Sequence, residues 1–158
     1  MHILAISGSL RAASWNSLLL RALARLAPSD IKVQLYQGMG TLPLFNPDLE
    51  CDEPASVASL RTQIIAADGL IIASPEYAHG VSGVMKNALD WMVGSEALVY
   101  KPVAVLNASP RAHHALAALK ETLSVMSAQL IEPASITLPI LGSKLDEDGV
   151  VADRQLAV

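Results

Sequence analysis

The sequence contains few cysteines, few aromatic residues and few charged residues. Its 158 residues include one cysteine, Cys51, so no disulfide can form within the chain. Aromatic residues make up 4% and charged residues 16%, whereas charged residues make up about 25% of a typical domain. The hydrophobic share of 52% excludes a disordered chain, because disorder requires low hydrophobicity and high net charge. A folded domain is therefore expected, with apolar surface left for a partner subunit.

The charge pattern excludes several kinds of partner. Eleven basic and fifteen acidic residues give a net charge of −4 without any Lys/Arg-rich run, so no nucleic-acid partner is expected. The longest uncharged stretch, residues 33–47, is interrupted by Gly and Pro and is too short for a membrane helix, which needs about 20 apolar residues. Met1 and His2 lead into an apolar run without the basic region of a signal peptide. With a single cysteine, a cytoplasmic protein is expected.

Short apolar runs alternate with amphipathic helical patterns along a length typical of one domain, residues 1–158. The pattern predicts strands at residues 2–7, 31–36, 69–74, 102–106 and 131–138. It predicts helices at residues 18–26, 57–65, 82–92 and 112–130. Such alternation is typical of an α/β fold with a parallel sheet covered by helices. Ligands then bind beyond the carboxyl ends of the strands, at the switch point in strand order.

The loop after the first strand gathers groups that bind anions. Directly before a helix it offers hydroxyls of Ser9, Ser14 and Ser17, the amide of Asn16 and the guanidinium of Arg11. Helix N-termini attract anions, and arginine binds phosphate in a bidentate manner. One serine alone would indicate a helix cap, but the cluster favours a phosphate site. The loop lacks both G-x-G-x-x-G and the P-loop pattern, so neither the usual dinucleotide turn nor a nucleoside triphosphate site is expected.

The loop after the third predicted strand has features of a site for a flat ligand. Pro75 stiffens the exit from the strand, and two later glycines allow close backbone approach. Tyr77 offers an aromatic face with a polar tip. Glu76 and His79 are expected to contact solvent, a substrate or a partner subunit, so they are candidates for a shared active site. Trp91, further along, is expected to pack in the helix.

The loop after the fourth predicted strand does not indicate a metal or a catalytic nucleophile. His113 and His114 are adjacent, so they do not share a helix face, and no Cys/His/Asp cluster supports them. The sequence also lacks a recognisable signature that pairs serine or cysteine with histidine for nucleophilic catalysis. No metal ligand and no catalytic residue is therefore nominated.

Two segments carry a family likeness. They are G-S-L-R-x-x-S-x-N at Gly8–Asn16 and P-E-Y-x-x-G-x-x-G-x-x-K-N-A-x-D-W at Pro75–Trp91. Together they resemble the NAD(P)H-dependent FMN reductase family, which includes quinone, chromate and azo-dye reductases. The resemblance implies a flavodoxin-like three-layer sandwich, with a five-stranded parallel sheet in the order 2-1-3-4-5 and FMN at the switch point.

Carried over position by position, the resemblance also implies cofactor contacts. It assigns the FMN phosphate to Ser9, Arg11, Ser14, Asn16 and Ser17. It assigns the isoalloxazine and ribityl groups, largely through the backbone, to Pro75, Glu76 and Tyr77. The sequence departs from the family pattern in three places: Ala78 and Ser82 stand where Asn and Pro are frequent, residues 109–112 are not glycine-rich, and the final helix is short, missing or replaced by a partner's surface.

The function implied is an enzyme that passes hydride from NADPH or NADH to FMN and then to a small electron acceptor. Arg11 would suit either a flavin phosphate or a nicotinamide 2′-phosphate, which leaves the nucleotide open. The alternatives are a flavodoxin-type electron carrier without NAD(P)H activity, or a receiver-like module, whose acidic cluster is absent after the first strand. A homodimer or homotetramer is expected, because Val84, Leu89, Trp91 and Met92 occupy more than one helix face.

Overall fold

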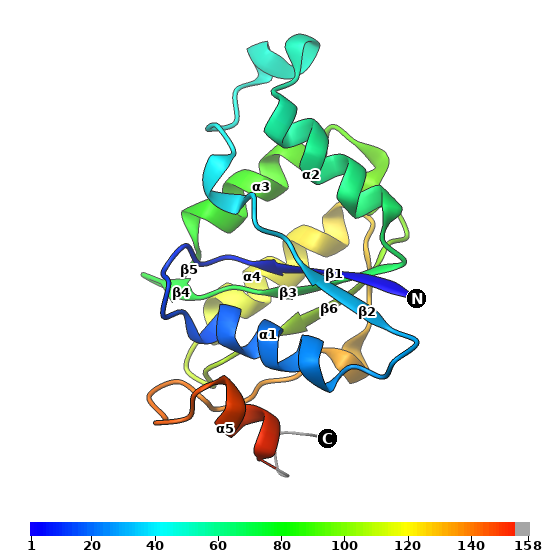
Figure 1. The fold of residues 1–158 in the computed structure, drawn as a ribbon. Coiled ribbons are helices and arrows are strands. Elements are labelled where there is room, and N and C mark those ends of the chain that lie inside the picture. Colours follow the sequence, from blue (N-terminus) through cyan, green and yellow to red (C-terminus); the bar gives the residue numbers. More distant parts are fainter. Residues whose placement is uncertain (154–158) are drawn as a thin grey trace.

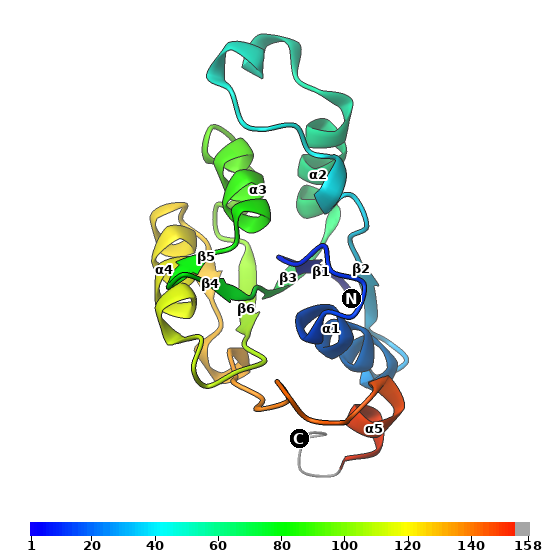
Figure 2. The same cartoon turned by 90° about the vertical axis from the view of Figure 1, so that its left-hand side faces the viewer.

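The structure, a computed structural model, describes residues 1–153. Its centre is a five-stranded parallel sheet in the order β2-β1-β3-β6-β7, covered by helices on both faces (Figure 1, Figure 2). The strands are β1 (His2–Ser7), β2 (Lys32–Leu35), β3 (Gly69–Ala73), β6 (Pro102–Leu106) and β7 (Gln129–Leu130). The flavodoxin-like order 2-1-3-4-5 is confirmed, and the switch point lies between β1 and β3. The end of the expected domain, residues 154–158, falls outside the described residues.

Each face of the sheet packs against its own helices. The helices are α1 (Trp15–Leu26), α2 (Ala55–Ala66), α3 (Gly83–Val93), α4 (His113–Val125) and α5 (Glu147–Ala152). Leu4 and Ile6 of β1 face the cluster formed with α2, α3 and α4, whereas Ala5 faces the cluster formed with α1 and α5. Because both faces are buried, the central strands are apolar along their length. Over residues 1–153, the helices are all too short or too polar to cross a membrane.

A small hairpin and four short 3-10 helices complete the fold. The hairpin joins β4 (Glu76–Tyr77) to β5 (Gly80–Val81), where the sequence indicated only a loop. The 3-10 helices are η1 (Met39–Thr41), η2 (Pro47–Asp52), η3 (Glu96–Leu98) and η4 (Glu132–Ala134). The hairpin lies beside α4 at the carboxyl end of the sheet (Figure 2).

The prediction of a strand at residues 131–138 is wrong. The last strand is only β7, and a 3-10 helix that contains Pro133, whose nitrogen carries no hydrogen for a ladder bond, follows it. Beyond it, one isolated bridge joins Thr137 to Asn107. The helix expected at residues 112–130 also ends early, at Val125, because Ser127 adopts a left-handed φ of 60°.

The expectation that α3 needs a second subunit to cover its apolar side chains is wrong for Trp91. Its side chain is 5% exposed, and Phe45 of the same chain packs edge-on against it at 5.1 Å between ring centroids. The indole Nε1 donates to the Pro43 carbonyl at 2.8 Å. Leu89 and Met92 are also buried. The loop after β2 therefore covers this helix, and the predicted packing role of Trp91 is confirmed.

Candidate functional site

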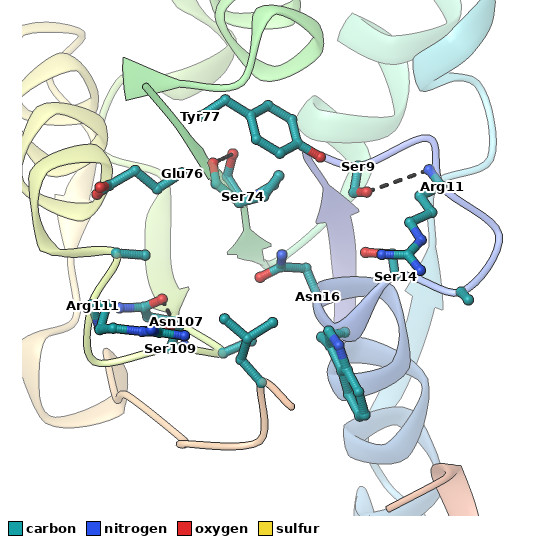
Figure 3. A pocket seen from close by; sticks show the side chains of 16 residues that line it. Ser9, Arg11, Ser14, Asn16, Ser74, Glu76, Tyr77, Asn107, Ser109 and Arg111 are labelled. Atoms are coloured by element: carbon teal, nitrogen blue, oxygen red, sulfur yellow. Dashed lines mark hydrogen bonds between the residues drawn. The ribbon is translucent and has the colours of Figure 1, made fainter. Parts of the chain in front are cut away.

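A cavity of about 350 Å³ opens beyond the carboxyl ends of β1, β3 and β6 (Figure 3). Its walls come from the β1–α1 loop, the segment after β3, the loop after β6 and Leu141. The volume is in the range of about 300–1,000 Å³ that small-molecule sites occupy. Seven of the eight site residues expected from the sequence line it: Ser9, Arg11, Ser14, Asn16, Pro75, Glu76 and Tyr77.

The β1–α1 loop presents the end of a helix to this cavity. Ser14 caps α1, and its Oγ accepts from the Ser17 amide at 3.3 Å. The Ser9 hydroxyl accepts from the backbone amide of Arg11 at 3.4 Å, which folds the loop back on itself. The amides of Trp15 and Asn16, at the start of α1, have no acceptor within the helix, as at any helix N-terminus. The loop therefore combines free amide donors, hydroxyls and a guanidinium in one wall.

Ser17, the eighth expected residue, does not line this cavity. Its hydroxyl lies 2.8 Å from that of Ser7, so it connects the first turn of α1 to the end of β1. The sequence could not separate it from Ser14, because Ser17 directly follows the motif that contains Ser14 and offers the same hydroxyl.

The loop after β3 is tied closely to the β1–α1 loop. The buried Ser82 hydroxyl donates to the Gly8 carbonyl at 2.6 Å and accepts from the Met85 amide at 3.3 Å as the cap of α3. A Cβ at Gly8 would lie 2.8 Å from Ser74 Cβ, so only glycine allows this approach. Ser82, where the family pattern has proline, therefore joins the two walls that meet at the switch point.

Glu76 lines the cavity, but its carboxylate points toward α4 (Figure 3). Its Oε2 accepts from the Ala115 amide at 2.9 Å. The N-cap position of α4, Ala112, has no side-chain acceptor, so Glu76 caps that helix from the hairpin. The Ala115 amide, and then the nearby His114 and His79, hold the pKa of Glu76 below its ordinary value.

The turn of the hairpin is held in a left-handed conformation. Ala78 and His79 have φ values of 49° and 62°, as a two-residue turn of type I′ requires. The His79 ring stacks on that of His114, with 4.3 Å between centroids. His79 does not line the cavity, so the expectation of a site contact from it has no support within this chain.

The loop after β6 forms the wall across from Arg11 (Figure 3). Asn107, Ser109 and Arg111 line the cavity, so this loop contributes to the site although residues 109–112 lack the glycines that are frequent in the family pattern. The Asn107 side chain accepts from the Ser109 amide at 3.1 Å, and the Ser109 hydroxyl accepts from the Arg111 amide at 3.2 Å. These two hydrogen bonds hold the turn of the loop. Arg111 gives the cavity a second positive charge.

The described residues contain no cluster of three or more His, Cys, Asp or Glu suited to hold a metal ion. The residues that line the cavity include two arginines and several hydroxyl and amide groups, which suit an anionic ligand with hydroxyl groups.

Residues 1–140 match the family described as NADPH-dependent FMN reductase. The chain belongs to this family. It is 35% identical to the quinone reductase of Escherichia coli strain K12 over 113 residues, which cover 69% of this chain and 60% of that protein. It is 33% identical to an NAD(P)H-dependent FMN reductase of Pseudomonas aeruginosa, over 97% of this chain and 85% of that protein.

Among solved structures, this FMN reductase family member is similar to FerB, a flavoenzyme NAD(P)H:(acceptor) oxidoreductase from Paracoccus denitrificans. The TM-score is 0.76 at 34% identity, and the match covers 82% of this chain and 74% of FerB. The chain spans 60% of the length of the E. coli quinone reductase and 49% of a Burkholderia 2-hydroxy-1,4-benzoquinone reductase that it also resembles.

The cavity of this family member fits FMN at one further point. The Asn16 side chain is 7% exposed, and its Oδ1 is buried without a hydrogen-bond partner among the described residues. Buried polar atoms in native proteins nearly always have partners. An oxygen in this position would accept from the hydroxyl of a bound ligand, and the same amide turned over would donate to an anionic oxygen. The ribityl phosphate of FMN offers both groups.

Proposed function

We propose that this chain binds FMN in the cavity and passes hydride from NAD(P)H to a small oxidised acceptor such as a quinone. The observation that carries the proposal is a cavity at the switch point of the sheet. There the capped end of α1 and Arg11 meet Asn16, whose Oδ1 has no hydrogen-bond partner among residues 1–153. Family membership and relatives named as quinone and FMN reductases support it.

The residues of the two loops bind different parts of FMN. Bound FMN supplies the centre that accepts and gives up hydride, and the protein supplies binding, orientation and electrostatics. Ser9, Arg11, Ser14 and Asn16 hold the phosphate end. The backbone of residues 75–77 would bind the ring, and the amides of residues 76–78 would stabilise negative charge on the flavin. No side chain is assigned proton transfer. Hydride transfer to the flavin needs no acid or base, and the proton that a quinone takes up besides the hydride would come from water.

Arg111 adds positive charge on the far wall, where an anionic nicotinamide nucleotide approaches the site. A cationic wall of this kind raises the local concentration of an anionic substrate. Arg11 is committed to the flavin phosphate in this arrangement, so Arg111 is the residue assigned to the second nucleotide.

The proposal also includes a homo-oligomer in the cytoplasm, either a dimer or a tetramer. Large apolar side chains stay exposed at the end of the molecule away from the cavity: Val93, Val99, Tyr100 and Val125. Exposed apolar groups of this kind are covered in many proteins by a partner. The exposed free thiol of Cys51 suits a reducing compartment.

The experiment that tests the function is NADPH oxidation by the purified protein with FMN and a quinone. Without oxygen, and with FMN at the protein's own concentration, we expect continuous loss of NADPH absorbance only when protein, FMN and quinone are all present. A flavodoxin-type carrier would bind FMN and accept electrons from a chemical reductant, but it would leave NADPH and NADH unoxidised. That result would contradict the enzyme activity while keeping the flavin site.

A further inference from the structure

The chain continues along the cavity wall after the family match ends at residue 140. Leu141 lines the cavity and is 46% exposed. Its amide donates to the Ala108 carbonyl at 3.0 Å, and the Leu138 amide donates to the Asn107 carbonyl at 2.8 Å. Two backbone hydrogen bonds therefore fix this segment against the loop after β6, directly beside the site.

Apolar packing holds the same segment against α1. Ile140 and Val150 are buried in one cluster with Leu19 and Leu20 of α1. The helix α5 lies directly against α1 at the edge of the molecule (Figure 1, Figure 2). We call residues 138–152 the clasp.

Ion pairs orient the clasp on α1. Arg21 Nε lies 2.8 Å from Glu147 Oε2, and Arg25 Nη1 lies 3.4 Å from Glu147 Oε1 and 2.6 Å from Asp148 Oδ1. All four side chains are partly or largely exposed to solvent, so each pair contributes little to folding. Glu147 is shared by both arginines, which makes it the central member of the network.

We propose that the clasp positions Leu141 as an apolar contact for the ring system of the bound cofactor. This inference rests on the proposed function. A flat apolar ring in the cavity would cover the exposed part of Leu141, and burial of apolar surface is favourable in proportion to its area. This hydrophobic contribution to the binding free energy does not depend on the phosphate of FMN. Leu141 would therefore strengthen the binding of FMN and of riboflavin alike. The clasp thus adds a binding determinant beyond the two sequence motifs.

The test measures dissociation constants for FMN and riboflavin from the quenching of flavin fluorescence. For Leu141→Ala we expect both constants to rise by about three- to tenfold, the size expected for covering a half-exposed leucine. Leu141→Met, which keeps an apolar side chain, should restore most of the affinity. The matched control is Leu26→Ala, since Leu26 is 42% exposed and does not line the cavity.

A second variant tests whether the ion pairs of the clasp hold Leu141 in place. Glu147→Gln keeps the size of the side chain and should weaken riboflavin binding by up to about fivefold. Combined with Leu141→Ala it should cause almost no further loss, because both changes remove the same contact. Additive losses, or a Glu147→Gln protein with unchanged riboflavin affinity, would overturn the role of the ion pairs.

The outcomes separate this inference from the proposed function. If the wild-type protein binds FMN and Leu141→Ala behaves like Leu26→Ala, the inference about Leu141 is overturned and the proposed function stands. If the wild-type protein binds neither flavin, both are overturned. A loss for FMN with none for riboflavin would also contradict the apolar contact.

Discussion

Replacing Ser82 tests whether one hydroxyl joins the two loops that carry the site. Its Oγ donates to the Gly8 carbonyl at 2.6 Å and accepts from the Met85 amide at 3.3 Å, and the side chain is buried. Ser82→Ala removes both hydrogen bonds, and also the 3.3 Å hydrogen bond between the Ser82 and Ser74 hydroxyls, while it adds no bulk. It leaves the Gly8 carbonyl without this donor and α3 without its cap.

The expected cost follows from these two losses. Replacement of a serine cap by alanine costs about 1 kcal/mol. Leaving a buried carbonyl without its partner costs a further ~1–3 kcal/mol. We therefore expect the free energy of unfolding to fall by about 2–4 kcal/mol. For a domain of this size that corresponds to a fall in Tm of about 4–15 °C.

The assay is urea unfolding followed by circular dichroism, with the midpoint and slope fitted separately. The control is Ser124→Ala, which changes an exposed serine on α4 and should shift the free energy of unfolding by less than about 0.5 kcal/mol. If Ser82→Ala is as stable as this control, Ser82 does not join the loops as described.

Two further changes concern the hairpin. Ala78→Asn should raise the free energy of unfolding by about 0.5–1 kcal/mol, because Asn tolerates the left-handed conformation that Ala78 adopts. Thermal unfolding measures this difference. A lower Tm for the variant would contradict the claim that Ala78 is strained. Glu76→Gln should be less stable than the wild type at neutral pH, since the lowered pKa of Glu76 means that its charged form stabilises the fold. That contribution is fully present above the ordinary pKa of 4.5 and is lost as the pH falls through the lowered value. A Tm difference between the wild type and Glu76→Gln that stays constant in acid would contradict the role of Glu76 as the cap of α4.

Much of the fold could be predicted from local pattern. The central strands are apolar along their length because helices cover both faces, and the helices show apolar stripes. The alternation predicts a parallel sheet with ligands at its carboxyl edge, whereas the strand order is implied by the family resemblance and not by the alternation. The two sequence motifs meet at the cavity, as expected. The last strand could not be predicted, because the apolar residues after Leu130 pack without a ladder and Pro133 interrupts them.

Parts of the site depend on contacts between distant segments, which no local pattern contains. The Glu76 carboxylate caps α4 by accepting from the Ala115 amide, 39 residues further along the chain. Trp91 is covered by the loop around Pro43. Leu141 reaches the cavity only because its backbone is bonded to Ala108. Each of these pairings is set by tertiary packing.

The most direct test of the central claim is titration of the protein with FMN and riboflavin, in wild type and in Arg11→Ala. A hydrogen bond to a charged group contributes about 1.5–3 kcal/mol, so Arg11→Ala should weaken FMN binding about tenfold or more. Riboflavin, which lacks the phosphate, should bind more weakly than FMN and be nearly insensitive to the change. Equal losses for both flavins, or no flavin binding by the wild type, would contradict a phosphate site at the end of α1.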